Sequence, residues 1–450
     1  MPLAIRLAGN MTTFFLWLSS VAQLFLLVIY FSLNLSVEPK SVEIITLLLS
    51  ILFCFLTIFF LSEKSVISKL TYSTTSLIVF LTYFLMNFMW DSQSISDFKE
   101  VTIGTSGGVI FAIITGCASA LSLGALSKCF SKDLLYIQLT KGVFLVIMVV
   151  SLLLALNVFL LTVGNIRSDI FLIEDQMGLY QRPGKIMLML YILLATLFAF
   201  MQQHIRKHFF WNLSALCLLV IIAIVLIAHS QLIGSNSGSV TVVSIMLAVL
   251  CYWFVIDTEK FLMLEKPLKL KQTIFSWITK KLILYFSLLL ILFLTSIFLL
   301  GDFNFDVSQF RIFGFGSGSN SSIDSRIHLL KDNFLIQFSY NPIFGNTIVD
   351  DLTTGSGTYT HSLISVLTHL GIVGAGFFLT MIFFIYRDIY TSQSECNNYY
   401  HTNSYALFRL FILTSVILFT LFTAFFTWTP LWFSIGLLGV SFNIKGSYYS

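Results

Sequence analysis

Residues 143–163 read VFLVIMVVSLLLALNVFLLTV and contain no charged side chain. A backbone surrounded by lipid must satisfy its own hydrogen bonds, and an α-helix does so within a single segment. A helix rises about 1.5 Å per residue, so a stretch of this length crosses roughly 30 Å of hydrocarbon. The stretch therefore predicts a membrane-spanning helix.

Stretches of the same kind recur along the chain of 450 residues, of which 57% are hydrophobic and 10% charged. A soluble domain has roughly 25% charged residues. This composition excludes a cytosolic enzyme and a disordered chain, and the lack of period-two alternation excludes an outer-membrane barrel. We expect an all-α polytopic membrane protein with twelve spans, at 12–33, 42–61, 70–89, 107–126, 142–164, 185–203, 209–228, 240–256, 282–300, 361–385, 405–426 and 431–444.

The distribution of basic residues over the loops predicts the orientation, because Lys and Arg favour the cytoplasmic side. With the N-terminus inside, 17 of the 25 Lys and Arg residues fall on the cytoplasmic side. Both termini are therefore expected in the cytoplasm. The chain then divides into nine spans over 1–300, a long outer loop over 301–360 and three spans over 361–450. The net charge of +4 is too small to favour nucleic acid as a partner.

The outer loop 301–360 contains one segment with a clear helical pattern. Residues 321–324, Ser-Ser-Ile-Asp, are similar to a capping box. Apolar side chains then follow along one face of a helix, and Asn341-Pro342 is expected to end it. The loop is therefore predicted to carry an amphipathic helix that lies on the membrane surface or covers a cavity; its apolar face consists of Ile323, Ile327, Leu330, Phe334 and Phe338.

His361 follows Thr360, a possible N-cap, at the predicted start of the tenth span. The positive end of the helix dipole favours neutral imidazole, the form that a general base needs, and attracts phosphate. The alternative is an interfacial histidine without a catalytic role. His369 is interpreted as a buried hydrogen-bonding residue. Small residues on the same helix are interpreted as helix-packing positions: Gly371, Gly374 and Gly376.

Polar chemistry is predicted at the outer side, because no Asp, Glu, Lys or Arg lies in the middle of a predicted span. Ion-coupled transporters usually keep ionisable residues there. The outer loops also lack an Asp-x-Asp pair that would suggest a metal-held diphosphate, so no metal or cofactor is expected. Half of the outer basic residues are arginines, whose planar fork suits phosphate. This pattern is typical of an enzyme that acts at the outer face on a lipid-borne substrate.

The segment 320–380 resembles the bacterial O-antigen ligase and O-antigen polymerase superfamily. The resemblance consists of Ser325-Arg326 at the start of a helix, then Asn341-Pro342-Ile343-Phe344-Gly345, His361 and Gly371-Ile372-Val373-Gly374. Arg167, ten residues and Gly178 are similar to an Arg-x10-Gly pattern of some polymerases. Three features depart from the family pattern. The turn Asn236-Ser237-Gly238 lacks an arginine, Ser362 follows His361 where asparagine is common, and no second Arg-x10-Gly follows Arg311 or Arg326.

This resemblance implies a glycosyltransferase of the C-type in the bacterial inner membrane, with a periplasmic active site. Its donor would be an undecaprenyl-diphosphate-linked glycan, and a chain-length regulator is a possible partner besides membrane lipid. His361 would be the base, and the diphosphate would be bound by Arg326 with Arg182, Arg167 or Arg311. The Arg-x10-Gly match favours an O-antigen polymerase over a ligase that transfers the polysaccharide to the lipid A core. A flippase for lipid-linked oligosaccharides is the alternative outside the enzymes.

Overall fold

The computed structural model describes residues 3–33, 39–62, 71–92, 101–130, 134–166, 177–204, 209–232, 236–264, 331–347, 349–353, 364–395, 400–420 and 428–439. Within these ranges every regular element is a helix and no strand occurs. Eight of the described helices are long and apolar enough to cross a membrane. The chain therefore has the architecture of a multi-pass helical membrane protein.

The described helices agree with ten of the predicted spans, the first eight together with the tenth and eleventh. The ninth predicted span, 282–300, lies outside the described residues, so the total of twelve stays a prediction. The helices are α1 (Leu3–Leu33), α2 (Pro39–Ser62), α3 (Tyr72–Ser92), α4 (Val101–Phe130), α5 (Leu134–Ile166), α6 (Met177–His204), α7 (Phe209–Leu232), α8 (Asn236–Leu264), α11 (Val349–Thr353), α12 (Ser365–Glu395), α13 (Tyr400–Thr420), α14 (Thr429–Ser434) and the π-helix η4 (Ile435–Gly439).

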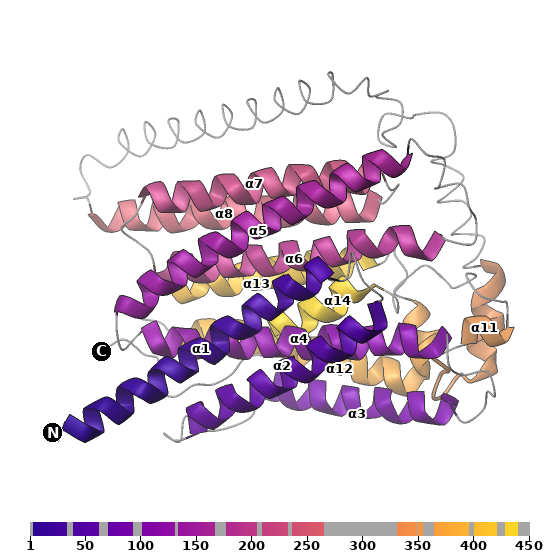
Figure 1. Cartoon of the computed structure of the whole chain (residues 1–450). Coiled ribbons are helices and arrows are strands. Elements are labelled where there is room, and N and C mark those ends of the chain that lie inside the picture. The colour runs from indigo at the N-terminus through magenta and orange to yellow at the C-terminus, as the bar shows by residue number, and fades with distance from the viewer. Residues whose placement is uncertain are drawn as a thin grey trace.

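The long helices lie side by side along one common direction, and α11 stands at one end of the bundle (Figure 1). The described start of α1 lies at the opposite end (Figure 1). The sequence predicts opposite sides of the membrane for these two segments, and the bundle separates them by its full length. Which side of the membrane each end faces stays a prediction.

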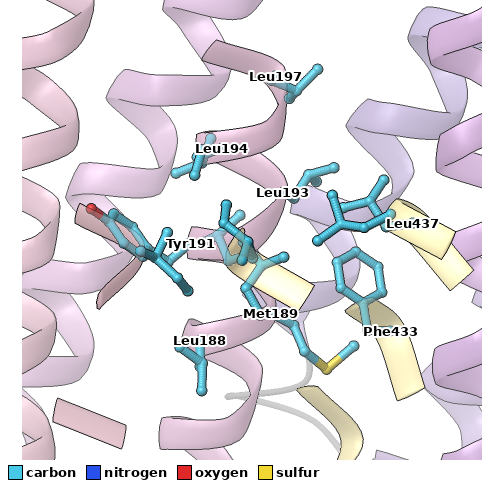
Figure 2. Packing of buried hydrophobic residues seen from close by; sticks show 14 of the residues in the cluster. Leu188, Met189, Tyr191, Leu193, Leu194, Leu197, Phe433 and Leu437 are labelled. Atoms are coloured by element: carbon cyan, nitrogen blue, oxygen red, sulfur yellow. The ribbon is translucent and has the colours of Figure 1, made fainter. Parts of the chain in front are cut away.

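Helix α6 is the centre of the bundle. Every residue over 186–202 is buried, and α6 packs against α1, α4, α5, α7, α8, α13 and α14. A helix that is apolar on all sides is expected to be enclosed by others. Figure 2 shows Met189 and Leu193 of α6 beside Phe433 and Leu437 of the C-terminal helices, with Tyr191 on the other side of α6.

Helix α2 lies at the periphery and is held to α1 by side-chain hydrogen bonds. The amide nitrogen of Gln23 donates to the hydroxyl oxygen of Ser50 over 3.1 Å, and the hydroxyls of Ser19 and Thr57 are 3.1 Å apart. Such bonds join helices in lipid, where burial of apolar surface contributes little to association. The outward face of α2 is apolar and suited to acyl chains: Ile44, Ile45, Leu48, Phe55 and Phe59.

The last predicted span, 431–444, is not one regular helix. The described part is the short α14 followed by one turn of π-helix, η4, and all of 431–439 is buried. Residues 440–444 lie outside the described residues. Gly116 of α4 and Gly436 of η4 meet where the two segments cross, because a Cβ at Gly116 would lie 2.5 Å from the carbonyl oxygen of Phe433. Both positions require glycine, because the backbones of the two segments are in direct contact at the crossing.

The end of η4 is completed by a side chain from α13. The guanidinium of Arg409 donates to the carbonyl oxygen of Leu438 through Nε, at 2.9 Å, and through Nη2. The last carbonyls of a helix have no partner within it, and a cation at that end also interacts favourably with the helix dipole. Arg409 thereby anchors the C-terminal segment to the bundle.

Substitution of Gly116 by alanine is expected to lower the stability of the protein by about 1–3 kcal/mol, because the added carbon overlaps the backbone of α14 and η4. The matched control is Gly142→Ala in α5, where an added Cβ meets nothing within 4 Å. Apparent melting temperatures of both variants in the same detergent measure the effect. Equal melting of Gly116→Ala and wild type would contradict the close crossing.

Candidate functional site

The sequence-predicted site residues fall almost entirely outside the described part of the chain. Four of the five are not among the described positions: Arg326, His361, Arg167 and Arg311. Arg182 lies in α6, but its side chain is not described. The structure therefore brings none of these five side chains together, and their roles stay predictions. It does describe the segments that follow Arg326 and His361.

The predicted loop helix is present over 331–340 and ends at Tyr340, directly before Asn341-Pro342, as expected. Phe334 and Phe338 are half-buried, and their rings stack with centroids 5.7 Å apart. The other positions of the predicted apolar face, Ile323, Ile327 and Leu330, lie outside the described residues. The exposed side of the helix is mixed, since apolar Leu335, Ile336 and Tyr340 lie among polar Lys331, Asp332 and Ser339. A helix of this kind is suited to the membrane interface.

Asn341-Pro342-Ile343-Phe344-Gly345 forms a closed turn after this helix. The Gly345 amide donates to the Asn341 carbonyl oxygen over 2.8 Å, and the Phe344 amide donates to the Asn341 side-chain oxygen over 3.3 Å. Asparagine supplies this extra acceptor, and proline presets the backbone angle at the second position of the turn. Gly345 has φ of 73°, a conformation that glycine adopts without strain.

This turn docks on a break in α12. Gly371 has φ 64° and ψ −174°, a combination that is essentially restricted to glycine. The amides of Ile372 and Val373 then donate to the carbonyls of Pro342 and Ile343, over 3.0 and 3.1 Å. The turn therefore supplies acceptors for the first amides of the second part of α12, which the broken helix cannot satisfy itself.

We call the contact between the turn 341–345 and the break at Gly371 the junction. It also includes the first part of α12, since the amide of Asn346 donates to the carbonyl of Thr368 over 3.3 Å. Gly345 and Gly371 face each other without space for a side chain. A Cβ on Gly345 would overlap the amide nitrogen of Gly371, and a Cβ on Gly371 would overlap the amide nitrogen of Gly345. Each glycine is required by the position of the other.

Helix α3 closes the junction from a third direction. The Tyr83 hydroxyl lies 2.7 Å from the carbonyl oxygens of both Phe344 and Leu370, so its proton can be donated to either. The side-chain amide of Asn87 donates to Phe344 over 2.9 Å. Tyr83 and Asn87 are four residues apart and share one face of α3. Three segments that are distant in sequence are thereby hydrogen-bonded at one point.

At its other end the α3–α12 pair is held by a carboxylate. Asp388 of α12 accepts a 2.7 Å hydrogen bond from the amide of Ser73 in the first turn of α3. Thr71 caps the N-terminus of α3, because its hydroxyl accepts a hydrogen bond from the amide of Thr74. The guanidinium of Arg387 lies 4.4 Å from the centroid of the Tyr72 ring. The two helices are thus fixed at both ends, so the junction sits on a rigid pair.

Two interpretations of the glycines in α12 need correction. Gly371 is a break in the helix and not a helix-packing position. A Cβ on Gly376 would meet nothing within 4 Å, so Gly376 packs against no described element. Gly374 agrees with the prediction, because a Cβ there would overlap the ring of Tyr83. Helix α12 begins at Ser365 after a turn at Ile364.

Polar side chains are buried in two segments near the junction, directly after the turn 341–345 and in the first part of α12: Asn346, Thr347, Ser365, Thr368 and His369. His369 is 4% exposed and directly precedes the last residue before the break, which agrees with its interpretation as a buried polar residue. Among the described residues, no three His, Cys, Asp or Glu side chains are grouped so that they could hold a metal ion.

Sequence reasoning missed Tyr83 and Asn87, although their spacing on one face of a predicted span was a usable signal. It also placed the start of the fifth span at 142, which excluded Lys141. That lysine is only 7% exposed and lies within the apolar part of α5. Comparison with models of protein families, with curated proteins and with solved structures finds no match to this chain.

Replacement of Tyr83 by phenylalanine is expected to cost about 0.5–1.5 kcal/mol, because one hydrogen bond to the junction is lost. Tyr72→Phe on the same helix is the matched control, since no hydrogen bond of the exposed Tyr72 hydroxyl occurs in the described part of the chain. Apparent melting temperatures in detergent compare the two. If both variants melt alike, the Tyr83 hydroxyl does not stabilise the junction.

Proposed function

We propose that this protein is an O-antigen polymerase that joins undecaprenyl-diphosphate-linked oligosaccharide repeat units at the periplasmic face of the inner membrane. The proposal rests chiefly on one observation. The two glycine-containing parts of the family-like pattern, Asn341–Gly345 and Gly371–Gly374, are hydrogen-bonded to each other at one end of the bundle. Their joint occurrence in the sequence therefore has a physical reason.

The position of the junction supports the assignment of roles. His361 precedes the described turn at Ile364 by three residues, and Arg326 precedes the described helix 331–340 by five. The chain spans at most about 3.6 Å per residue, so connectivity restricts how far either residue can lie from these segments. The segments themselves are held together by the hydrogen bonds of the turn, of α3 and of α12.

The proposed reaction is a glycosyl transfer. A hydroxyl of the acceptor sugar attacks the anomeric carbon of the donor glycan, and the bond from that carbon to the diphosphate oxygen breaks. The hydroxyl proton passes to His361, and undecaprenyl diphosphate leaves with the bonding electron pair. Arg326, together with Arg182, Arg167 or Arg311, neutralises the charge that develops on the leaving diphosphate. The arginines would then supply the positive charge.

Deletion of the gene tests the function. For a polymerase we expect lipopolysaccharide that carries a single repeat unit on its core, because ligation continues without polymerisation. A gel of the lipopolysaccharide shows this as loss of the ladder, and a plasmid copy of the wild-type gene should restore it. A bare core with polymer still on the lipid carrier would indicate a ligase instead. An unchanged ladder would reject both enzymes and indicate that the protein acts on another glycan.

The role of His361 is tested by His361→Ala, which should reduce the rate of polymer formation by about 10²–10⁴-fold, the usual contribution of a general base. The measurement uses membranes supplied with lipid-linked repeat units, with the protein level in the membrane determined in parallel. The neighbouring Ser362→Ala is the control and should retain activity. Full activity of a normally inserted His361→Ala variant would remove His361 from the mechanism.

A further inference from the structure

One side chain of α3, which lies beside α12 (Figure 1), contacts all three segments that meet at the junction. The ring of Tyr83 packs on the second part of α12, where a Cβ on Gly374 would overlap it and where the ring centroid of Phe377 lies 5.3 Å away. The hydroxyl of the same side chain reaches the carbonyl of Leu370 in the first part of α12 and that of Phe344 in the turn, over 2.7 Å each. Tyr83 therefore fixes the turn and both parts of α12 relative to one another.

Asn87 completes the hydrogen bonding of these two carbonyls. The Tyr83 hydroxyl has a single proton, so it donates to one carbonyl at a time. The side-chain amide of Asn87, which is buried, donates to Phe344 over 2.9 Å. This bond leaves the tyrosine proton for Leu370. The two side chains thus work as a pair, and loss of either one removes a donor from the junction.

The first part of α12 depends on such contacts for its direction. It comprises only 365–370, about one and a half turns, and a helix of that length is marginal by itself. The backbone angles at Gly371 interrupt the helix, and hinges are formed by a few residues of this kind at the ends of elements. The short helix is held from outside by the bond from the Asn346 amide to the Thr368 carbonyl and by the bond from Tyr83.

We propose that Tyr83 and Asn87 are positioning residues for the proposed glycosyl transfer. They act through the junction, which connects the helix 331–340 that follows Arg326 with the first part of α12 that follows His361. Neither is a catalytic residue, because their polar groups are bound to backbone carbonyls. The inference rests on the proposed function. It assigns to α3, a helix without any sequence-predicted site residue, the task of keeping the two segments in register.

The expected effect on the reaction follows from how sensitive catalysis is to position. A displacement of about 1 Å that originates far from the reacting atoms can lower the rate about 10²-fold. Removal of an interaction that serves only the transition state lowers kcat and leaves KM unchanged. A contact that serves only the stability of the bundle changes neither constant in the protein that stays folded. The two constants therefore separate a positioning role from a structural one.

The first measurement is hydrogen exchange of the purified full-length protein in detergent, followed by mass spectrometry. Tyr83→Phe and Asn87→Leu should each speed exchange of the amides in 343–346 and 371–374 by roughly 3- to 10-fold, because a hydrogen bond that holds the turn on α12 is lost. Tyr72→Phe on the same helix is the control and should exchange as wild type does. Wild-type exchange in both folded junction variants would overturn the inference.

The second measurement is turnover by the same purified variants, with lipid-linked repeat units extracted from the deletion strain as substrate. Tyr83→Phe and Asn87→Leu should lower kcat by roughly 10- to 100-fold and leave KM within about three-fold of wild type. Either variant decides the question if the other fails to fold. Gly116→Ala is the matched control, because it loses stability at a crossing between other helices. Assayed well below its melting temperature, it should keep the wild-type kcat.

Two kinetic outcomes would contradict the proposal. Wild-type kcat in variants whose junction amides exchange faster would show that the contacts serve stability alone. An equal fall of kcat in Gly116→Ala would show that any loss of stability has the same effect, and would overturn the positioning role as well.

Failure of this inference can be told apart from failure of the proposed function. A lost lipopolysaccharide ladder in the deletion strain, with wild-type kcat in Tyr83→Phe, would retain the polymerase and reject the positioning role. An unchanged ladder would reject the polymerase and with it any role in this reaction, whatever the hydrogen exchange of the junction shows.

Discussion

The structure around the candidate site depends on one constraint, which is that a backbone in a membrane must find hydrogen-bond partners within the protein. Helix α12 breaks at Gly371 and leaves amides that its own turns cannot satisfy. The turn at 341–345 supplies the carbonyls, and Tyr83 and Asn87 of α3 bind the same turn. One break thereby determines where the long loop, α3 and α12 must meet.

The remainder of the bundle follows from the weakness of hydrophobic association in lipid. Helices are joined where backbones approach closely, as at Gly116 and Gly436, or where side chains bond across, as from Arg409 to Leu438. The central helix α6 is enclosed by the helices that pack around it. A frame of this kind keeps polar groups at one end in fixed positions, which the proposed transfer between two bound sugars would require.

Local sequence patterns were sufficient to predict helices whose position depends only on the residues of one segment. The apolar stretch 143–163 lies within α5, and the loop helix ends before Asn341-Pro342. The same patterns did not predict contacts between segments that are distant in sequence. Gly371 stands among apolar residues that favour a continuous helix, so nothing nearby in sequence marks the break. The site residues themselves were proposed from spacing and resemblance, and four of the five, His361, Arg326, Arg167 and Arg311, lie outside the described residues.

The sequence by itself determined that the chain forms apolar helices long enough to cross a membrane, since length and hydrophobicity are properties of each segment alone. Only the tertiary structure decided that Gly345 and Gly371 face each other and that the last segment contains a π-helix. These features depend on which segments become neighbours. Close approach of two backbones exists only after the bundle has assembled.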